Sequence, residues 1–295
     1  MLRPLLLVLL AGSILPAAAQ QRVSFPSTDA DLAGGKPTTI TGWLYRPRGD
    51  GPFPAVVGMH GCGGLVLHRG RHRGEPQPTF ADWGERLAAA GYIVLLPDSY
   101  GPRGIDEICS VKDRGTLSRA RPRDAYGALA WLQAQPFVVP GRVALIGWSH
   151  GGGTVMRTAD ARSEARPASL PHGDFGAAVA FYPGCPDPKK GKSGRNWRSA
   201  IPLLVLIGEA EDWVPAAPCR NLGEAAAARG DRNITVHLYP GAYHAFDSAT
   251  PGVRVRTGLA TAPGGQAHLG QNPEARADAL VRVPAFLRSR LGGGA

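Results

Sequence analysis

The sequence predicts an α/β protein with a mostly parallel central sheet and helices on both faces. Short apolar runs recur along the chain and alternate with segments of helical periodicity, an order typical of parallel sheets. Several of these runs are apolar throughout, as expected for strands that are buried on both faces. With 295 residues, 43% of them hydrophobic, the chain is long enough for one large domain with a sizeable core.

The N-terminus has the features of a secretory signal. Arg3 gives a positive start, residues 5–15 are mostly apolar, and three alanines at positions 17–19 suit cleavage. A transmembrane helix needs about 20 apolar residues, whereas this run is shorter and is interrupted by Pro16. We therefore predict a signal peptide over residues 1–19, a single mature domain over 20–295, a periplasmic or secreted location, and no membrane anchor after cleavage.

The first half of the mature chain is expected to supply three strands and two helices. Phe80, Trp83 and Leu87 recur at helical spacing, and Gly91 then stops the first helix. The run after Gly91, YIVLLPD, is continuously apolar up to Asp98 and indicates a buried strand. We expect strands over residues 38–47, 55–61 and 92–98, and helices over residues 79–90 and 124–134.

The second half continues the alternation. We expect strands over residues 142–147, 177–183, 202–208 and 234–240, and helices after Ser149 and over residues 216–229 and 273–291. Two long segments, 184–200 and 248–271, are too polar and too rich in Gly and Pro for the core. Loops of that length are often functional.

Ser149 lies in the stretch LIGWSHGGG, between Gly147 and Gly151. This is the G-x-S-x-G pattern of a nucleophile elbow, in which a sharp strand-to-helix turn exposes the serine and leaves room only for glycine on either side. The five-residue pattern is moderately specific by itself. Here an apolar strand precedes it and small residues follow it, and this context predicts that Ser149 is a catalytic nucleophile.

A serine nucleophile needs a histidine base, and the base needs a carboxylate to orient it. In scaffolds with this elbow, the acid and then the histidine follow the serine along the chain. Asp212 lies in GEAEDWVP, directly after the strand over 202–208, and is the predicted acid. Glu209 and Glu211 in the same loop remain alternatives.

His244 is the predicted base. It lies in YPGAYHAF, just after the strand over 234–240 and before the last helix. His268 is also in the required chain order, but it lies in a Gly-rich stretch with no strand before it. His237 lies inside a strand, where it would not reach the elbow.

An acyl-transfer enzyme also needs N–H donors for the oxyanion. The residue after the nucleophile, His150, supplies one backbone N–H, and the loop after an early strand supplies the second. That loop is HGCGG, residues 60–64, and we assign the second N–H to Cys62, with Gly61 or Gly63 as alternatives. Cys62 has no elbow context of its own, and His60 is expected to support the loop.

The four cysteines allow three pairings, and disulfides suit an exported protein. No two have the C-x-x-C spacing of a zinc site, so no metal is expected. Cys62 and Cys109 follow strands expected to be neighbours, as do Cys185 and Cys219. We therefore predict the disulfides Cys62–Cys109 and Cys185–Cys219.

The formal net charge is +10, but no nucleic-acid-binding motif accompanies it. Arg103 follows the strand over 92–98 and either binds a substrate carboxylate or braces its own loop through carbonyls or Asp98. Trp148 and Tyr243 flank two catalytic candidates and either line an acyl pocket or belong to the core. A basic loop could attract anionic substrates, although a solvated surface is the simpler interpretation; it contains Lys189, Lys190, Lys192 and Arg195.

Six stretches in this order resemble the dienelactone hydrolase family of α/β-hydrolases over nearly the whole mature chain: HGCGG, GYIVLLPDSYGPRG, RDAYGALAWL, GWSHGGG, GEAEDWVP and YPGAYHAF. The resemblance implies an α/β-hydrolase fold and a carboxylic-ester hydrolase that works through an acyl-enzyme. The founding members of the family use cysteine as the nucleophile, whereas this chain has Ser149. Dienelactone itself is therefore doubtful as the substrate.

The sequence thus predicts a secreted or periplasmic serine esterase that acts on a small-molecule ester with the triad Ser149, Asp212 and His244. It predicts no cofactor, no nucleic-acid partner and a monomer. A peptidase or amidase, an acyltransferase, or a non-catalytic binding protein of the same fold are the alternatives, because a fold alone does not fix a function.

Overall fold

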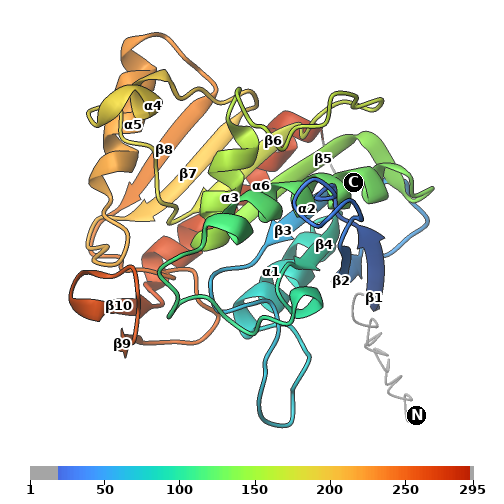
Figure 1. The fold of residues 1–295 in the computed structure, drawn as a ribbon, viewed down its shortest axis with the longest axis horizontal. Coiled ribbons are helices and arrows are strands. Elements are labelled where there is room, and N and C mark those ends of the chain that lie inside the picture. Colours follow the sequence, from blue (N-terminus) through green and yellow to red (C-terminus); the bar gives the residue numbers. More distant parts are fainter. Residues whose placement is uncertain (1–18, 293–295) are drawn as a thin grey trace, which may run out of the picture.

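The computed structural model describes residues 19–292, so the predicted signal peptide lies outside the described residues except for Ala19. Eight strands form one sheet in the order β1-β2-β4-β3-β5-β6-β7-β8 (Figure 1). β2 is antiparallel to both of its neighbours, and the other strands are parallel. The strands are β1 (Ala19–Pro26), β2 (Thr39–Arg46), β3 (Phe53–Met59), β4 (Ile93–Asp98), β5 (Val138–Trp148), β6 (Ala177–Phe181), β7 (Leu203–Gly208) and β8 (Ile234–Tyr239).

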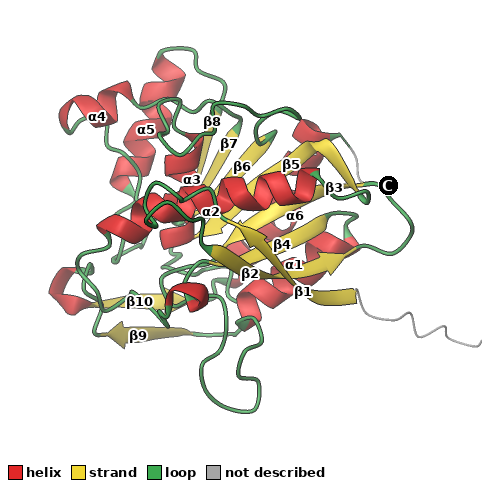
Figure 2. Ribbon diagram, turned by 45° about the vertical axis from the view of Figure 1, so that its right-hand side comes forward, coloured by secondary structure: helices red, strands yellow, loops and turns green. Residues whose placement is uncertain are grey.

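Helices cover both faces of this sheet, and its central strands are therefore buried along their whole length. α2 and α3 pack together over one face, and α1 and α6 lie on the other (Figures 1 and 2). The predicted α/β-hydrolase architecture is confirmed. The helices are α1 (Pro78–Ala89), α2 (Gly115–Gln133), α3 (His150–Ala159), α4 (Gly191–Asn196), α5 (Ala217–Ala228) and α6 (Pro273–Leu291), with short 3₁₀ turns η1 (Gly101–Arg103) and η2 (Pro263–Gly265).

Most predicted elements lie within a few residues of their observed positions, and the differences have physical causes. α2 begins nine residues before the predicted start, because its first turns carry polar and basic residues that hid the helical pattern. β1 was not predicted. The segment 184–200 contains α4, and the segment 248–271 contains a hairpin of β9 (Val253–Thr257) and β10 (Gln266–Gly270).

The parallel strands end at one edge of the sheet, and the loops that leave this edge carry the predicted site residues. Ser149 follows β5, the acidic loop follows β7, and His244 follows β8. The β9–β10 hairpin lies beyond the same edge, separate from the main sheet (Figure 2). Among the described residues, no helix is both long and apolar enough to cross a bilayer.

Both expected disulfides are present. Cys62–Cys109 joins the loop after β3 to the segment before α2, and Cys185–Cys219 joins the loop after β6 to α5. The first bridge closes a separation of 47 residues and the second one of 34 residues. Each bridge begins on a loop that leaves the carboxyl edge of the sheet, at Cys62 after β3 and at Cys185 after β6.

We expect replacement of both Cys62 and Cys109 by alanine to lower the free energy of unfolding by about 4 kcal/mol, because a long closed loop restricts the unfolded chain. Ester hydrolysis should fall as well, since Cys62 lies beside the nucleophile. Urea unfolding with a parallel activity assay tests this, and the matched Cys185→Ala/Cys219→Ala variant should keep more activity. An unchanged unfolding midpoint in the first variant would contradict the expectation.

Candidate active site

Ser149 occupies a strained turn between β5 and α3. Its φ and ψ are 56° and −116°, a conformation that non-glycine residues rarely adopt. The Ser149 N–H donates to the carbonyl of Phe181 at 3.0 Å, and its own carbonyl accepts from Gly153 at 2.8 Å. Hydrogen bonds to both of its backbone groups thus hold the turn.

The two glycines of the motif are required by close backbone packing. A Cβ on Gly151 would overlap the carbonyl oxygen of Met59, and a Cβ on Gly147 would overlap the carbonyl oxygen of Gly151. β3, β5 and α3 therefore meet at a distance that only glycine permits. This packing accounts for the positions of both glycines in the sequence pattern.

His244 lies between the nucleophile and a carboxylate. Its Nε2 accepts from the Ser149 hydroxyl at 2.9 Å, and its Nδ1 donates to Glu211 at 2.9 and 3.1 Å. The side chain of Glu211 is fully buried, and its Oε1 also accepts the backbone N–H groups of Trp213 and Val214. Serine, histidine and glutamate thus form one continuous relay.

The prediction that Asp212 is the acid is wrong. Its carboxylate accepts the backbone N–H of His268 at 3.0 Å and the His268 ring nitrogen at 2.7 Å, and its side chain is 40% exposed. Neighbouring residues in this loop face opposite ways, so Glu211 faces the core and Asp212 faces the β9–β10 hairpin. From the sequence, Glu211 had remained an alternative to Asp212 as the acid of the triad.

Two aromatic rings pack against His244. The ring centroids of Tyr182 and Trp213 lie 4.5 and 4.6 Å from that of the imidazole. Ser149, Tyr182 and Ala245 are the non-glycine residues with positive φ among residues 19–292, and all three line the cavity in front of His244. Strained backbone is thus concentrated at the site, as is common where a structure fixes reactive groups.

A buried carboxylate joins the segments that carry this relay. Asp247 is fully buried and accepts from the indoles of Trp83 and Trp148 at 2.7 and 2.9 Å and from the Tyr182 hydroxyl at 2.8 Å. Trp148 directly precedes the nucleophile, and Asp247 follows His244 by three residues. Although burial raises the pKa of Asp247, the three donors oppose that rise. No sequence motif indicated that Asp247 belongs to the site.

The loop after β3 lies against the elbow, as expected for an oxyanion loop. A Cβ on Gly61 would lie 3.6 Å from the Cβ of Ser149, and Cys62 lines the cavity in front of the serine. His60 is fully buried; the Ser99 N–H donates to its Nε2, so its Nδ1 carries the proton and donates to the Gly61 carbonyl. His60 therefore supports the loop and is not a base.

The His150 side chain lies against positive charge. Burial, together with the neighbouring Arg121, lowers the pKa of His150 to about 2, so its ring is neutral. The Arg121 guanidinium is itself fully buried, 2.5 Å from His150 Nδ1, and it donates to the His60 carbonyl. Because Nδ1 accepts from Arg121, the ring proton lies on Nε2, 3.4 Å from the Ser118 hydroxyl, so the expected oxyanion donor of His150 remains its backbone N–H.

Comparison with known proteins agrees with this geometry. The family model of the dienelactone hydrolase family matches residues 40–291. The chain belongs to this family. It is accordingly a hydrolase of the dienelactone hydrolase type.

Individual relatives are distant. The chain is similar to a candidate carboxymethylenebutenolidase of Synechocystis sp., with 26% identity over 219 residues that cover 70% of this chain and 81% of the relative. A second one, from Azospirillum brasilense, is 24% identical over 90% of this chain and all of the relative. Among solved structures, the dienelactone hydrolase-like promiscuous phosphotriesterase P91 from metagenomic libraries shares the fold, with a TM-score of 0.64, 20% identity and coverage of 93% and 100% of the two chains.

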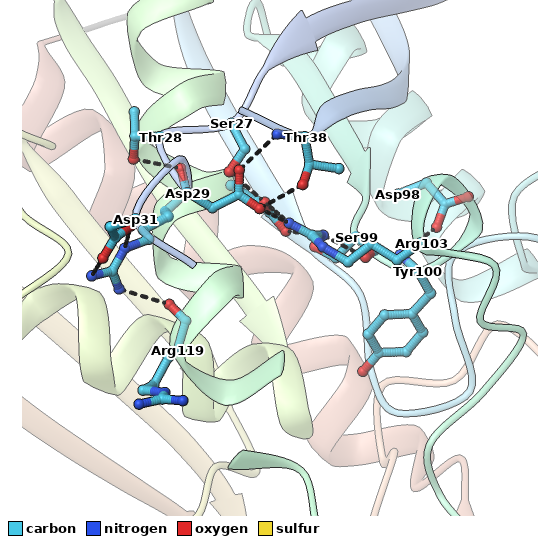
Figure 3. A network of polar contacts seen from close by, with 12 residues as sticks. Ser27, Thr28, Asp29, Asp31, Thr38, Asp98, Ser99, Tyr100, Arg103 and Arg119 are labelled. Atoms are coloured by element: carbon cyan, nitrogen blue, oxygen red, sulfur yellow. Dashed lines mark hydrogen bonds and ion pairs between the residues drawn. The ribbon is translucent and has the colours of Figure 1, made fainter. Parts of the chain in front are cut away.

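In this member of the dienelactone hydrolase family, Arg103 braces the fold. Its guanidinium pairs with Asp29 at 2.7 Å and donates to the Ser99 carbonyl (Figure 3). It also pairs with Asp124 at 2.8 Å. Asp124 is fully buried, and burial raises its pKa against the effect of Arg103. Arg103 is therefore engaged away from the cavity, so of its two expected roles it has the bracing one, through the Ser99 carbonyl as expected but through Asp29 and Asp124 and not Asp98.

Replacing Arg103 by glutamine should cost about 3–5 kcal/mol of stability, because it leaves the carboxylate of Asp124 buried without its ion-pair partner. Guanidinium chloride unfolding of both proteins measures the loss. At a temperature where the variant is folded, its KM for an ester should stay close to that of the wild type. A rise in KM without loss of stability would instead support substrate binding by Arg103.

The other predicted binding residues have different positions. Trp148 lines the cavity through a small exposed part and otherwise belongs to the core. The ring of Tyr243 stacks on His268 at 4.9 Å, outside the set of residues that line the cavity. Lys189 donates to Asn221 on α5, and the basic loop lies away from the cavity. Two arginines of the hairpin, Arg254 and Arg256, line the cavity instead.

Proposed function

We propose that the chain hydrolyses carboxylic esters through a covalent acyl-enzyme on Ser149. The observation that carries this proposal is the relay from Ser149 to His244 at 2.9 Å and from His244 to Glu211 at 2.9 Å. Membership of the dienelactone hydrolase family supports the same chemistry. The triad is therefore Ser149, His244 and Glu211.

In the first half of the reaction, the Ser149 oxygen attacks the ester carbonyl while His244 Nε2 takes the hydroxyl proton. Glu211 holds His244 with Nδ1 protonated and stabilises the imidazolium that forms. The backbone N–H groups of His150 and Cys62 bind the negative charge that develops on the carbonyl oxygen. His244 then gives its proton to the leaving alcohol, and the acyl group stays on Ser149.

In the second half, His244 removes a proton from water, which attacks the acyl-enzyme. Collapse of the second tetrahedral intermediate releases the acid and restores the Ser149 hydroxyl. The aromatic rings of Tyr182 and Trp213 limit the movement of the imidazole between its two tasks. No group beyond these side chains and backbone donors is required for the cycle.

Brief exposure to p-nitrophenyl acetate followed by acid quenching tests the mechanism. We expect a burst of p-nitrophenol and an acetyl group on the tryptic peptide that contains Ser149. Turnover with the acetyl group on another residue would contradict the assignment of the nucleophile. A protein with both disulfides intact and no turnover of any short ester would contradict the esterase proposal.

The N-terminal sequence and the two disulfides also support export to the periplasm or the cell exterior. Expression of the full chain in a Gram-negative host, followed by N-terminal sequencing, tests this proposal. We expect the mature protein in the periplasmic fraction, beginning at Gln20. A protein that keeps Met1 and stays in the cytoplasm would contradict it.

A further inference from the structure

Asp247 is a buried carboxylate to which the reaction cycle above gives no task. None of its surface is exposed. Its Oδ2 accepts the indole N–H groups of Trp83 and Trp148 at 2.7 and 2.9 Å, and its Oδ1 accepts the Tyr182 hydroxyl at 2.8 Å. The donors come from α1, from the end of β5 and from the residue after β6, so three separate elements converge on one carboxylate.

The surroundings of this carboxylate suit its charged form. Indole N–H groups can only donate, so a proton on Oδ2 would find no acceptor there. Burial raises the pKa of Tyr182 well above its usual range, and the negative charge of Asp247 adds to this rise, so the phenol stays a neutral donor. Burial also raises the pKa of Asp247, whereas the hydrogen bonds from Tyr182 and the two indoles lower it.

Among residues 19–292, the side chains that donate to this carboxylate are all uncharged. Arg276 on α6 donates to the main-chain carbonyl of Asp247, and its guanidinium pairs with Asp82 on α1 at 2.7 Å. A buried charge without an ionic partner is costly. The cost is offset where a positive charge forms nearby during a reaction, because fixed charges act strongly in a site that excludes water.

Such a positive charge forms on His244 in each half of the proposed cycle, and Tyr182 connects His244 to Asp247. The Tyr182 ring centroid lies 4.5 Å from that of the imidazole, with a tilt of 57° between the planes. An aromatic ring within about 6 Å attracts a cation, and more so when it is desolvated. A phenol that donates to a carboxylate is polarised by it, which makes the ring more electron-rich.

The backbone holds Tyr182 in this place. Its φ is 37°, which is rare for a residue with a side chain, and its N–H donates to the Leu206 carbonyl at 2.6 Å. A strained residue with a buried hydroxyl and a ring against the catalytic base is consistent with a role in the reaction.

We propose that Asp247 is a positioning residue for the esterase reaction, which acts through the hydroxyl and ring of Tyr182 to stabilise the imidazolium of His244. This inference rests on the proposed esterase function. No bond to Asp247 forms or breaks, and the Tyr182 proton stays on its oxygen. Glu211 acts on Nδ1 of His244, whereas Asp247 acts through an aromatic contact, so two buried carboxylates stabilise one imidazolium.

Asp247→Asn tests this proposal, because the amide keeps the shape of the carboxylate and removes its charge. The amide oxygen can accept both indoles, and the amide NH₂ can donate to the Tyr182 oxygen. The measurement is kcat/KM for phenyl acetate as a function of pH, which reports the ionisation of the free enzyme. We expect the plateau to fall about five- to tenfold and the acid limb to move down by about 0.7–1 pH unit.

The direction follows from the role of His244, which is active as a neutral base. Loss of a nearby negative charge disfavours the imidazolium, so the base stays neutral to lower pH. The same loss destabilises the imidazolium in the transition state, so the plateau and the acid limb should change by matching amounts. Glu211, the other charged group that contacts the imidazole, is unchanged in every variant. A merely structural disturbance would lower the plateau and leave the acid limb in place.

Asp29→Asn is the matched control. The Asp29 side chain is 2% exposed, and it contacts Thr38 and Arg103, away from His244. This variant also removes one buried carboxylate charge, and its guanidinium partner keeps Asp124. Its acid limb should coincide with that of the wild type. An equal shift in this variant would overturn the proposal, because the effect would not depend on contact with Tyr182.

Tyr182→Phe tests the connection, because it keeps the ring and removes the hydroxyl. We expect its acid limb to move in the same direction as that of Asp247→Asn. When the two substitutions are combined, the second should change kcat/KM by less than about twofold, since coupled residues are not additive. Additive losses would mean that Asp247 does not act through Tyr182 and would overturn the proposal.

An acid limb that stays at the wild-type pH in Asp247→Asn would also overturn the proposal and leave the esterase function in place. If Asp247→Asn does not fold, Tyr182→Phe decides alone, and an unmoved acid limb in that variant counts against the proposal. If the wild type with both disulfides intact hydrolyses no short ester, the proposed function fails and this inference fails with it.

Discussion

Replacing Ser149 by alanine should lower kcat for a short ester on the order of a million-fold, because the nucleophile and the base act as one unit. The variant keeps its oxyanion donors, so only a slow water-driven hydrolysis should remain. Hydrolysis of p-nitrophenyl acetate by purified wild type and variant measures the loss. The variant should bind the substrate with an affinity close to that of the wild type.

The comparison is valid when the variant retains both disulfides and a cooperative unfolding transition. Residual activity within a hundredfold of the wild type would identify another nucleophile. Cys62 is not an obvious substitute, because its sulfur is bonded to Cys109. Such a result would therefore require a second site elsewhere on the surface.

The second large effect is expected at Glu211. Replacing it by glutamine should lower kcat about 10⁴-fold, because a neutral amide neither stabilises the imidazolium nor holds the productive tautomer of His244. Steady-state kinetics on the same ester measure the effect. Asp212→Asn is the matched control: it changes the next residue, which contacts His268, and kcat should stay within a few-fold of the wild type.

A strong loss in Asp212→Asn together with an active Glu211→Gln would restore the first interpretation of the sequence. A comparable loss in both variants would mean that the hairpin contact of Asp212 also controls the position of His244. Such control has a structural route, because His268 lies in β10 and the Gly270 N–H of the same strand donates to the His244 carbonyl at 2.8 Å. The kinetic ratio of the two variants therefore decides between the two carboxylates.

The sequence predicted those elements whose apolar residues form a continuous run or recur at the spacing of a helix. β4, β6 and β7 are buried on both faces and, apart from Asp98 at the end of β4, apolar, and Gly91 and Pro273 mark helix boundaries directly. The hairpin was read as a loop because Gly and Pro surround it. The segment VRVRT nevertheless alternates at the period of a strand, and that signal could have identified β9.

The candidate site was predictable where the chemistry is tied to a turn. Gly147 and Gly151 mark Ser149 because backbone packing excludes any side chain there. The choice between Glu211 and Asp212 depends on which of the two side chains an irregular loop turns toward His244, and no regular spacing of residues predicts this. Arg254, Arg256 and Asp247 enter the site through tertiary contacts across the sheet edge, which neighbouring residues in the sequence do not reveal.

The carboxylate shared by Trp83 and Trp148 also provides an optical probe. These are two of the six tryptophans, and both indole N–H groups donate to Oδ2 of Asp247. Indole emission responds to nearby charge and polarity, so a shift of Asp247 would change the fluorescence of both rings together. Because Asp247 follows His244 so closely, intrinsic fluorescence can follow ligand entry without a label.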